Sequence, residues 1–298
     1  MSVGDRLRDI AHQAAAWLDP ELGRYAPLKP FLREAVPDDL ERLDADAFVP
    51  ATARFGSGVD LREDEQLHLL CGWQDRFGSL FETLRADPQI NTQAQGKPYL
   101  HNGWYPTPDA EVYAAMIADR QPTRIVEIGA GYSTRIARRV INELGLATEL
   151  VVIDPDPRAE VSSYADTLVQ KRVEEIAPGA IPPVDGRTIL FVDSSHIVRA
   201  AGDVPLLFCW LIPSLPVGVL VHVHDVFLPY DYPPAYRRRL YGEAYVLWAL
   251  LAGGSRCQTV FATHLMVRTQ REEMQRVFGP IVGADSLYYG ASFWFELM

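Results

Sequence analysis

From residue 124 onward, short runs rich in β-branched residues alternate with stretches that have helical periodicity. This alternation is typical of a parallel sheet covered by helices on both faces. We therefore predict an α/β fold, a doubly wound and mostly parallel sheet whose aromatic last strand is added antiparallel. The strands are expected at 124–128, 149–154, 172–176 (the weakest signal), 188–192, 217–224, 257–263 and 286–297, and helices at 133–144, 204–215 and 236–251.

The first third of the chain has a different pattern. Apolar residues recur at a spacing near 3.6 around Leu67, Leu70 and Leu84, which predicts an amphipathic helix. Residues 91–108 are rich in turn formers and aromatic residues, which is typical of a loop. We therefore expect a helical N-terminal cap or substrate region at 1–95 and a second domain, which contains the sheet, at 96–298.

Charge and composition exclude several classes of partner. The net charge is −11, whereas a protein that follows a phosphate backbone needs clustered Lys and Arg, so we expect no nucleic-acid substrate. Prolines and a glycine interrupt the apolar run at 204–223, and the N-terminus has no apolar signal core, so we expect no membrane span. The three cysteines are widely separated, which favours a cytoplasmic protein without disulfides.

Two signals point to a nucleoside-type ligand at the carboxyl ends of the first two strands. Gly129 and Gly131 follow the first strand and allow a sharp turn close to a ligand, and Ser133 or Thr134 can cap the next helix. Asp154 ends the second strand, where an acid can accept hydrogen bonds from ribose hydroxyls. The third glycine of a dinucleotide motif is absent, and Glu127 would repel a pyrophosphate, so a nicotinamide dehydrogenase is disfavoured. A purely structural turn is the alternative.

Four polar residues follow the next two strands: Asp193 and His196 after one, and His224 and Asp225 at the end of the other. Such a cluster could bind a divalent cation that acidifies a substrate hydroxyl. Alternatively, a neutral imidazole could take the hydroxyl proton directly. A hydrogen-bonded loop network without catalytic function is the third interpretation. His222, deeper in the strand, is expected to be a core histidine.

Aromatic residues flank the predicted site in sequence. Trp104 and Tyr105 lie before the first strand, and Tyr230 lies in a proline-flanked loop after Asp225. They could line an acceptor pocket, since ligand pockets are mostly apolar and aromatic. Ordinary packing between cap and core would explain them equally well.

The segments VEIGAGYSTRIA, VVIDPDPR, ILFVDSSH and VLVHVHDVFLPYDYP resemble the successive motifs of class I S-adenosylmethionine (SAM)-dependent methyltransferases, which have a Rossmann-like fold. The resemblance is to the bacterial branch of small-molecule O-methyltransferases and cephalosporin-hydroxylase-like proteins, and it extends over about residues 99–298.

The resemblance also implies roles for individual residues. Residues 127, 129, 130 and 131 (Glu127, Gly129, Ala130 and Gly131) would surround the methionine and ribose of SAM, and Asp154 would hold the ribose hydroxyls. Asp193 would lie beside the transferred methyl group and, with Asp225, could hold Mg²⁺ or another divalent cation. Metal-dependent relatives commonly have two adjacent acidic or amide residues where this chain has His224 and Asp225.

The expected activity is methyl transfer from SAM to a hydroxyl of a small molecule, such as a sugar, a polyketide or a phenol-like natural product. His196, His224 and Asp193 are the expected catalytic residues. Two alternatives are a SAM-fold enzyme with hydroxylase- or cyclase-like chemistry and a non-catalytic SAM-binding protein. The sequence leaves the oligomeric state open, a homo-oligomer included.

Overall fold

Seven short hydrophobic strands form one sheet in the computed structural model of the chain. The structure describes residues 54–56, 58–93, 96–157, 161–176, 184–233, 236, 239–254, 256–279 and 290–298. Two compact units are present, one comprising 1–50 and 234–240 and the other 51–233 and 241–298. The second unit contains the whole sheet and is the one considered below.

The strand order is β3-β2-β1-β4-β5-β7-β6. The strands are β1 (Arg124–Ile128), β2 (Glu149–Ile153), β3 (Thr167–Val169), β4 (Thr188–Val192), β5 (Leu220–Val223), β6 (Cys257–Ala262) and β7 (Phe293–Leu297). In this order, each neighbouring pair from β3 through β5 is parallel, and β7 is antiparallel to both of its neighbours, β5 and β6. The predicted fold class is therefore confirmed. The strand order reverses between β1 and β4, which is where open α/β sheets bind ligands.

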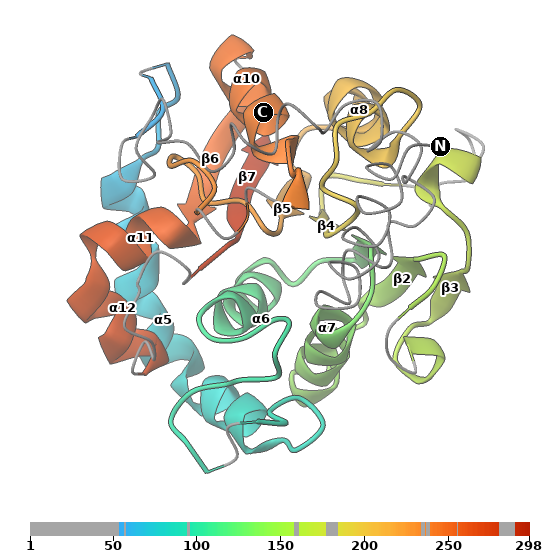
Figure 1. Cartoon of the computed structure of the whole chain (residues 1–298). Coiled ribbons are helices and arrows are strands. Elements are labelled where there is room, and N and C mark those ends of the chain that lie inside the picture. The colour runs from blue at the N-terminus through green and yellow to red at the C-terminus, as the bar shows by residue number, and fades with distance from the viewer. Residues whose placement is uncertain are drawn as a thin grey trace, which may run out of the picture. The chain divides into compact units, whose positions relative to one another are not determined.

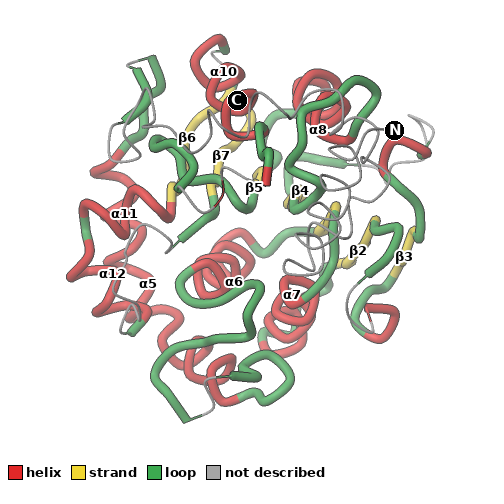
Figure 2. Tube along the Cα trace, viewed as in Figure 1, coloured by secondary structure: helices red, strands yellow, loops and turns green. Residues whose placement is uncertain are grey.

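Helices cover the sheet on both sides (Figures 1 and 2). The helices are α5 (Glu63–Ala86), α6 (Asp109–Arg120), α7 (Tyr132–Glu143), α8 (Asp203–Leu206), α9 (Ile212–Ser214), α10 (Glu243–Gly253), α11 (Thr263–Thr269) and α12 (Arg271–Phe278). A π-helical turn, Leu207–Leu211, joins α8 to α9. In Figure 1, α5, α6, α7, α11 and α12 lie on one side of the strands, and α8 and α10 lie on the other.

Alternation along the strands sends side chains to two apolar layers. Ile125, Leu150 and Phe191 face the layer of α5, α6 and α7, where they join one buried cluster with Trp73 and Tyr113. Glu127 and His222 have the same parity as these residues, so the sheet directs two ionisable side chains into an apolar layer.

The structure differs from the predicted elements in several places. The third strand is Thr167–Val169, and the expected strand at 172–176 is instead the 3₁₀ turn Val173–Glu175. This edge strand has only three residues, partly exposed, so its sequence lacks a clear hydrophobic pattern. The last strand begins at Phe293; residues 280–289, which include part of the expected strand, lie outside the described residues.

The predicted domain division at residue 95 stays a prediction. The compact unit that contains the sheet begins at Ala51 and so includes α5. The helix packs closely with α12 and α6, and its buried Trp73 ring lies 4.8 Å from that of Phe261 in β6. The apolar face that made α5 predictable is thus buried in the layer beside the sheet. The rest of the expected cap, residues 1–53, lies outside the described residues. None of the described helices has the length and apolar content needed to cross a membrane.

Candidate active site at the carboxyl ends of the strands

The loop after β1 fits against the end of β4 with no room for a side chain. Gly129 has φ +92°, a left-handed conformation that favours glycine. A Cβ atom built on Gly129 would lie 1.8 Å from the Asp193 carbonyl oxygen. The Gly129 N–H donates to the Ile153 carbonyl at 2.9 Å, and the Asp193 N–H donates to Ile128 at 2.8 Å. The loop is thereby held between the ends of β2 and β4.

Asp154 lies at the end of β2, as predicted, and is half-buried. One carboxylate oxygen accepts the Ala130 N–H at 2.8 Å, and the other accepts the Asp156 N–H at 2.7 Å. Asp154 therefore fixes the glycine loop, and its partial exposure leaves the carboxylate accessible from the crevice. Its role as a ribose ligand stays a prediction.

Glu127 is fully buried and helps to fix the same loop through hydrogen bonds. Its carboxylate accepts hydrogen bonds from the hydroxyls of Tyr113, at 3.0 Å, and Thr134. Burial raises the pKa of Glu127 to about 7, although the hydroxyls of Thr134, Tyr113 and Ser133 oppose the increase. Thr134 in turn accepts the Gly131 N–H at 3.3 Å. Glu127 and the buried Ser133 thus contact the loop that we predicted to hold the cofactor, and their contact with the cofactor itself stays a prediction.

The four polar residues predicted after β4 and β5 meet at one point. His196 Nε2 lies 3.3 Å from an Asp193 carboxylate oxygen and 3.6 Å from one of Asp225. His224 Nδ1 lies 3.6 Å from Asp193 and 3.9 Å from Asp225. Both imidazoles are buried, and the two carboxylates are partly exposed. The predicted cluster is therefore present.

Two buried acids that the sequence analysis missed flank this cluster. Glu243, the first residue of α10, pairs with His196 Nδ1. Asp109, the first residue of α6, lies 3.9 Å from His224 Nε2 and accepts the Ala291 N–H at 2.9 Å. Neither acid follows a strand, so the rule that led to the other four could not find them. The only signal in the sequence is an acid at the start of each helix, which usually indicates nothing more than an exposed helix N-terminus.

The charges of the cluster are strongly coupled. Burial by itself would lower the pKa of each histidine. The neighbouring carboxylates outweigh this effect of burial and hold the pKa of each histidine well above the usual range. The main contribution comes from Glu243 for His196 and from Asp193 for His224. Burial would raise the pKa of Asp193, but the two histidines hold it well below its ordinary value. The carboxylates thus favour the protonated form of both imidazoles, whereas a free general base must be neutral.

The donor set fits a divalent cation. Asp193, His196 and Asp225 each offer a ligand atom, and these atoms all lie within 4.8 Å of one another. Carboxylate oxygens and an imidazole nitrogen are ordinary ligands of divalent metal ions. His222 takes no part in this arrangement. It is fully buried, its ring stacks on Phe191 at 4.0 Å, and burial lowers its pKa well below the usual value, so the prediction of a core histidine is confirmed.

The three aromatic residues predicted to line an acceptor pocket lie in different surroundings. Tyr105 is buried, and its ring lies 4.8 Å from that of His224, so it contacts the cluster. Trp104 is 47% exposed. Tyr230 is buried under the Arg268 guanidinium, 4.2 Å from its ring centre, and contacts no residue of the cluster. Only Tyr105 is therefore brought to the site; the substrate role of all three stays a prediction.

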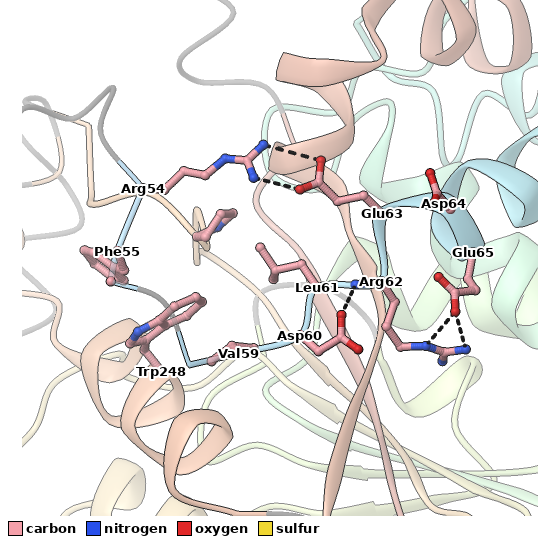
Figure 3. Close-up of a pocket in the computed structure, with 12 residues that line it drawn as sticks. Arg54, Phe55, Val59, Asp60, Leu61, Arg62, Glu63, Asp64, Glu65 and Trp248 are labelled. Atoms are coloured by element: carbon pink, nitrogen blue, oxygen red, sulfur yellow. Dashed lines mark hydrogen bonds and ion pairs between the residues drawn. The ribbon is translucent and has the colours of Figure 1, made fainter.

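A separate pocket of about 540 Å³ opens beside the start of α5 (Figure 3). Phe55 and Trp248, whose rings meet edge to face at 5.6 Å, form one wall, and the Arg54–Glu63 ion pair lies across from them. No residue of the polar cluster lines this pocket.

Comparisons with known proteins agree with this geometry. A family model described as a methyltransferase domain matches residues 126–226. A protein of Archaeoglobus fulgidus described as uncharacterized is 29% identical over 143 residues, which is 47% of this chain and 62%, less than two thirds, of that protein.

Two solved structures are also similar, at low identity. A proposed O-methyltransferase of Klebsiella pneumoniae is 15% identical, covers 78% of this chain and 99% of its own, and has a TM-score of 0.44. The Bacillus cereus O-methyltransferase, solved with S-adenosylhomocysteine, is 12% identical with the same coverage, 78% and 99%, and has a TM-score of 0.40.

The matched segment begins in β1, includes the glycine loop and Asp154, and ends just after Asp225, so it contains all four residues of the polar cluster. With its sheet order and its antiparallel β7, the chain has the architecture that the sequence motifs predicted. Residues 126–226 are therefore similar to a methyltransferase domain.

Proposed function

We propose that this protein transfers the methyl group of SAM to a hydroxyl group of a small molecule and that a divalent cation assists the reaction. The observation that carries the proposal is the meeting of two features at the strand-order reversal of the sheet. The glycine loop and Asp154 lie at the ends of β1 and β2, and the Asp193–His196–His224–Asp225 cluster lies at the ends of β4 and β5.

SAM would lie over the loop of residues 129–131, with Asp154 holding the ribose hydroxyls. Supporting this, Gly129 lets the backbone approach a ligand without a side chain between them, and Asp154 is partly exposed at the expected strand end. SAM supplies the reactive methyl group, so the protein's task is to align the acceptor and remove its proton.

Asp193, Asp225 and His196 would hold the cation, whose contribution when bound is to lower the pKa of the acceptor hydroxyl. A cation held there would offset the carboxylate charges that favour protonated His224. His224 would be the residue that accepts the acceptor proton, and Asp109 on its other side would favour the resulting imidazolium. The acceptor oxygen forms the new O–CH₃ bond while the S–CH₃ bonding pair goes to sulfur, which leaves S-adenosylhomocysteine.

The net charge of −11 supports a small-molecule acceptor over nucleic acid, and the absence of a disulfide-type cysteine pattern supports a cytoplasmic setting. Tyr105 beside His224 supports an acceptor with an apolar or aromatic face.

Mass spectrometry of small molecules retained through purification tests the cofactor, and S-adenosylhomocysteine formation with a panel of phenols, catechols and sugars tests the reaction. We expect retained SAM or S-adenosylhomocysteine and turnover that a chelator abolishes. A protein that binds neither compound in calorimetry, while folded, would contradict the proposal. SAM binding with an altered acceptor but no S-adenosylhomocysteine would favour non-methylating chemistry.

A further inference from the structure

The proposed function assigns no role to Glu243, a buried acid of the site. It is the first residue of α10, and none of its surface is exposed. Its Oε1 atom pairs with His196 Nδ1, whereas Oε2 is buried without a hydrogen-bond partner among the described residues. Burying a carboxylate is costly unless it is paired, and within the described part of the chain the side chain that pairs with this one is His196.

The backbone of this helix start also holds His196. The N–H groups of Gly242 and Glu243 both donate to the His196 carbonyl, at 2.8 and 3.3 Å. The Tyr241 ring lies 4.4 Å from the imidazole. Three consecutive residues, 241–243, therefore fix one histidine.

His196 itself has a strained backbone, with φ +62°. A non-glycine residue in the left-handed region is strained and persists only where its surroundings determine it. The strained conformation and the Glu243 pair together direct Nε2 toward Asp193 and Asp225, at 3.3 and 3.6 Å. A proton kept on Nδ1 and donated to Glu243 would leave the Nε2 lone pair available to a cation held by the two carboxylates.

We propose that Glu243 is a positioning residue that holds His196 as a neutral nitrogen ligand and so makes the cluster a site for a transition-metal dication, such as Mn²⁺, rather than for Mg²⁺. A carboxylate behind a metal-bound imidazole fixes its tautomer and raises its basicity. Mg²⁺ prefers oxygen ligands and water, whereas imidazole suits transition-metal ions. This proposal rests on one part of the proposed function, namely that a cation binds to this cluster.

The test is a binding titration of the chelator-stripped full-length protein with Mn²⁺ and with Mg²⁺, followed for Mn²⁺ by its electron paramagnetic resonance signal. We expect the wild type to bind Mn²⁺ about tenfold or more tighter than Mg²⁺. Pulsed resonance on the Mn²⁺ complex should show coupling to an imidazole nitrogen. Equal affinities, or no nitrogen coupling, would overturn the proposal without the use of any variant.

Glu243→Gln is the informative substitution because the Gln carbonyl can still accept from Nδ1–H while the charge is lost. We expect Mn²⁺ binding to weaken about 10- to 100-fold, with Mg²⁺ binding changed less. Glu111→Gln is the matched control, since Glu111 is also fully buried but pairs with Arg85, away from the cluster. Unchanged Mn²⁺ affinity in folded Glu243→Gln, or an equal loss in the control, would overturn the role of Glu243. If the wild type binds SAM but no dication, this proposal fails and the SAM site stands.

Discussion

Gly129 makes the closest backbone contact of the site, so its substitution should have a large effect on stability and activity. In Gly129→Ala the new methyl group would begin 1.8 Å from the Asp193 carbonyl oxygen, and Cβ atoms essentially never approach closer than 3.0 Å. The two backbones would therefore have to separate by about 1.2 Å or more. Neither segment moves freely, since Gly129 and Asp193 are each hydrogen-bonded to a neighbouring strand end.

Two costs add in this variant. A non-glycine residue at φ +92° costs about 1–3 kcal/mol, and forcing backbone apart in a packed region costs about 1–3 kcal/mol more. We expect a loss of roughly 2–6 kcal/mol, which lowers the melting temperature by about 4–12 °C at about 2 °C per kcal/mol for a chain of this size. Because Asp193 belongs to the cluster, a displacement of about 1 Å should also reduce methyl transfer about 100-fold.

Gly131→Ala is the matched control two residues away. Gly131 has φ 175°, which any residue adopts, and no atom of the described residues lies within 4 Å of the point where a Cβ would stand. Its stability should stay within about 0.5 kcal/mol of the wild type. Thermal unfolding of both variants by calorimetry makes the comparison. A Gly129→Ala protein as stable as Gly131→Ala would refute the close packing of the glycine loop on β4.

Four further substitutions test the cofactor site, the histidines and the buried Glu127. Asp154→Ala should weaken SAM binding in calorimetry by about tenfold or more, since it removes the proposed ribose acceptor and the Ala130 bond; unchanged affinity would contradict the role. His196→Ala and His224→Ala should each reduce the turnover rate by about 10²–10⁴-fold while SAM affinity stays within about twofold; an equal loss of SAM binding in both would count against the assignment. The pKa of Glu127 is raised from 4.5 to about 7, so its stabilising contribution is complete below pH 4.5 and is lost as the pH rises through 7. Glu127→Gln should therefore gain stability relative to the wild type between pH 5 and pH 8, on the order of 2 kcal/mol, and parallel denaturation curves across that range would refute the assignment.

The sequence predicts those parts of the fold that depend on local patterns. Each central strand is a short, mostly apolar run, so its position and the carboxyl-end residues Asp154, Asp193 and Asp225 could be predicted directly. The edge strand β3 could not, since three partly exposed residues leave no pattern. Helices α6, α11 and α12 were not predicted. Helix α6 is buried on nearly all sides, so it lacks the polar face that makes an amphipathic period visible.

The residues of the site likewise divide into those that the sequence predicts and those that it does not. Residues that follow strands meet because parallel strands end at one edge, which is a rule of topology. Glu243 and Asp109 reach the cluster only because α10 and α6 pack where they do, and no spacing in the chain records a contact across 47 or 115 residues. Tyr230 is close to Asp225 in sequence, but in the structure its ring lies under the Arg268 guanidinium, and its substrate role stays a prediction.

A crystal structure of the protein grown with S-adenosylhomocysteine and Mn²⁺ tests the central claim most directly. We expect an adenosyl group over Gly129 with its ribose hydroxyls bound by Asp154, and an anomalous peak between Asp193, His196 and Asp225. A nucleoside bound elsewhere, or a metal peak away from these three side chains, would contradict it.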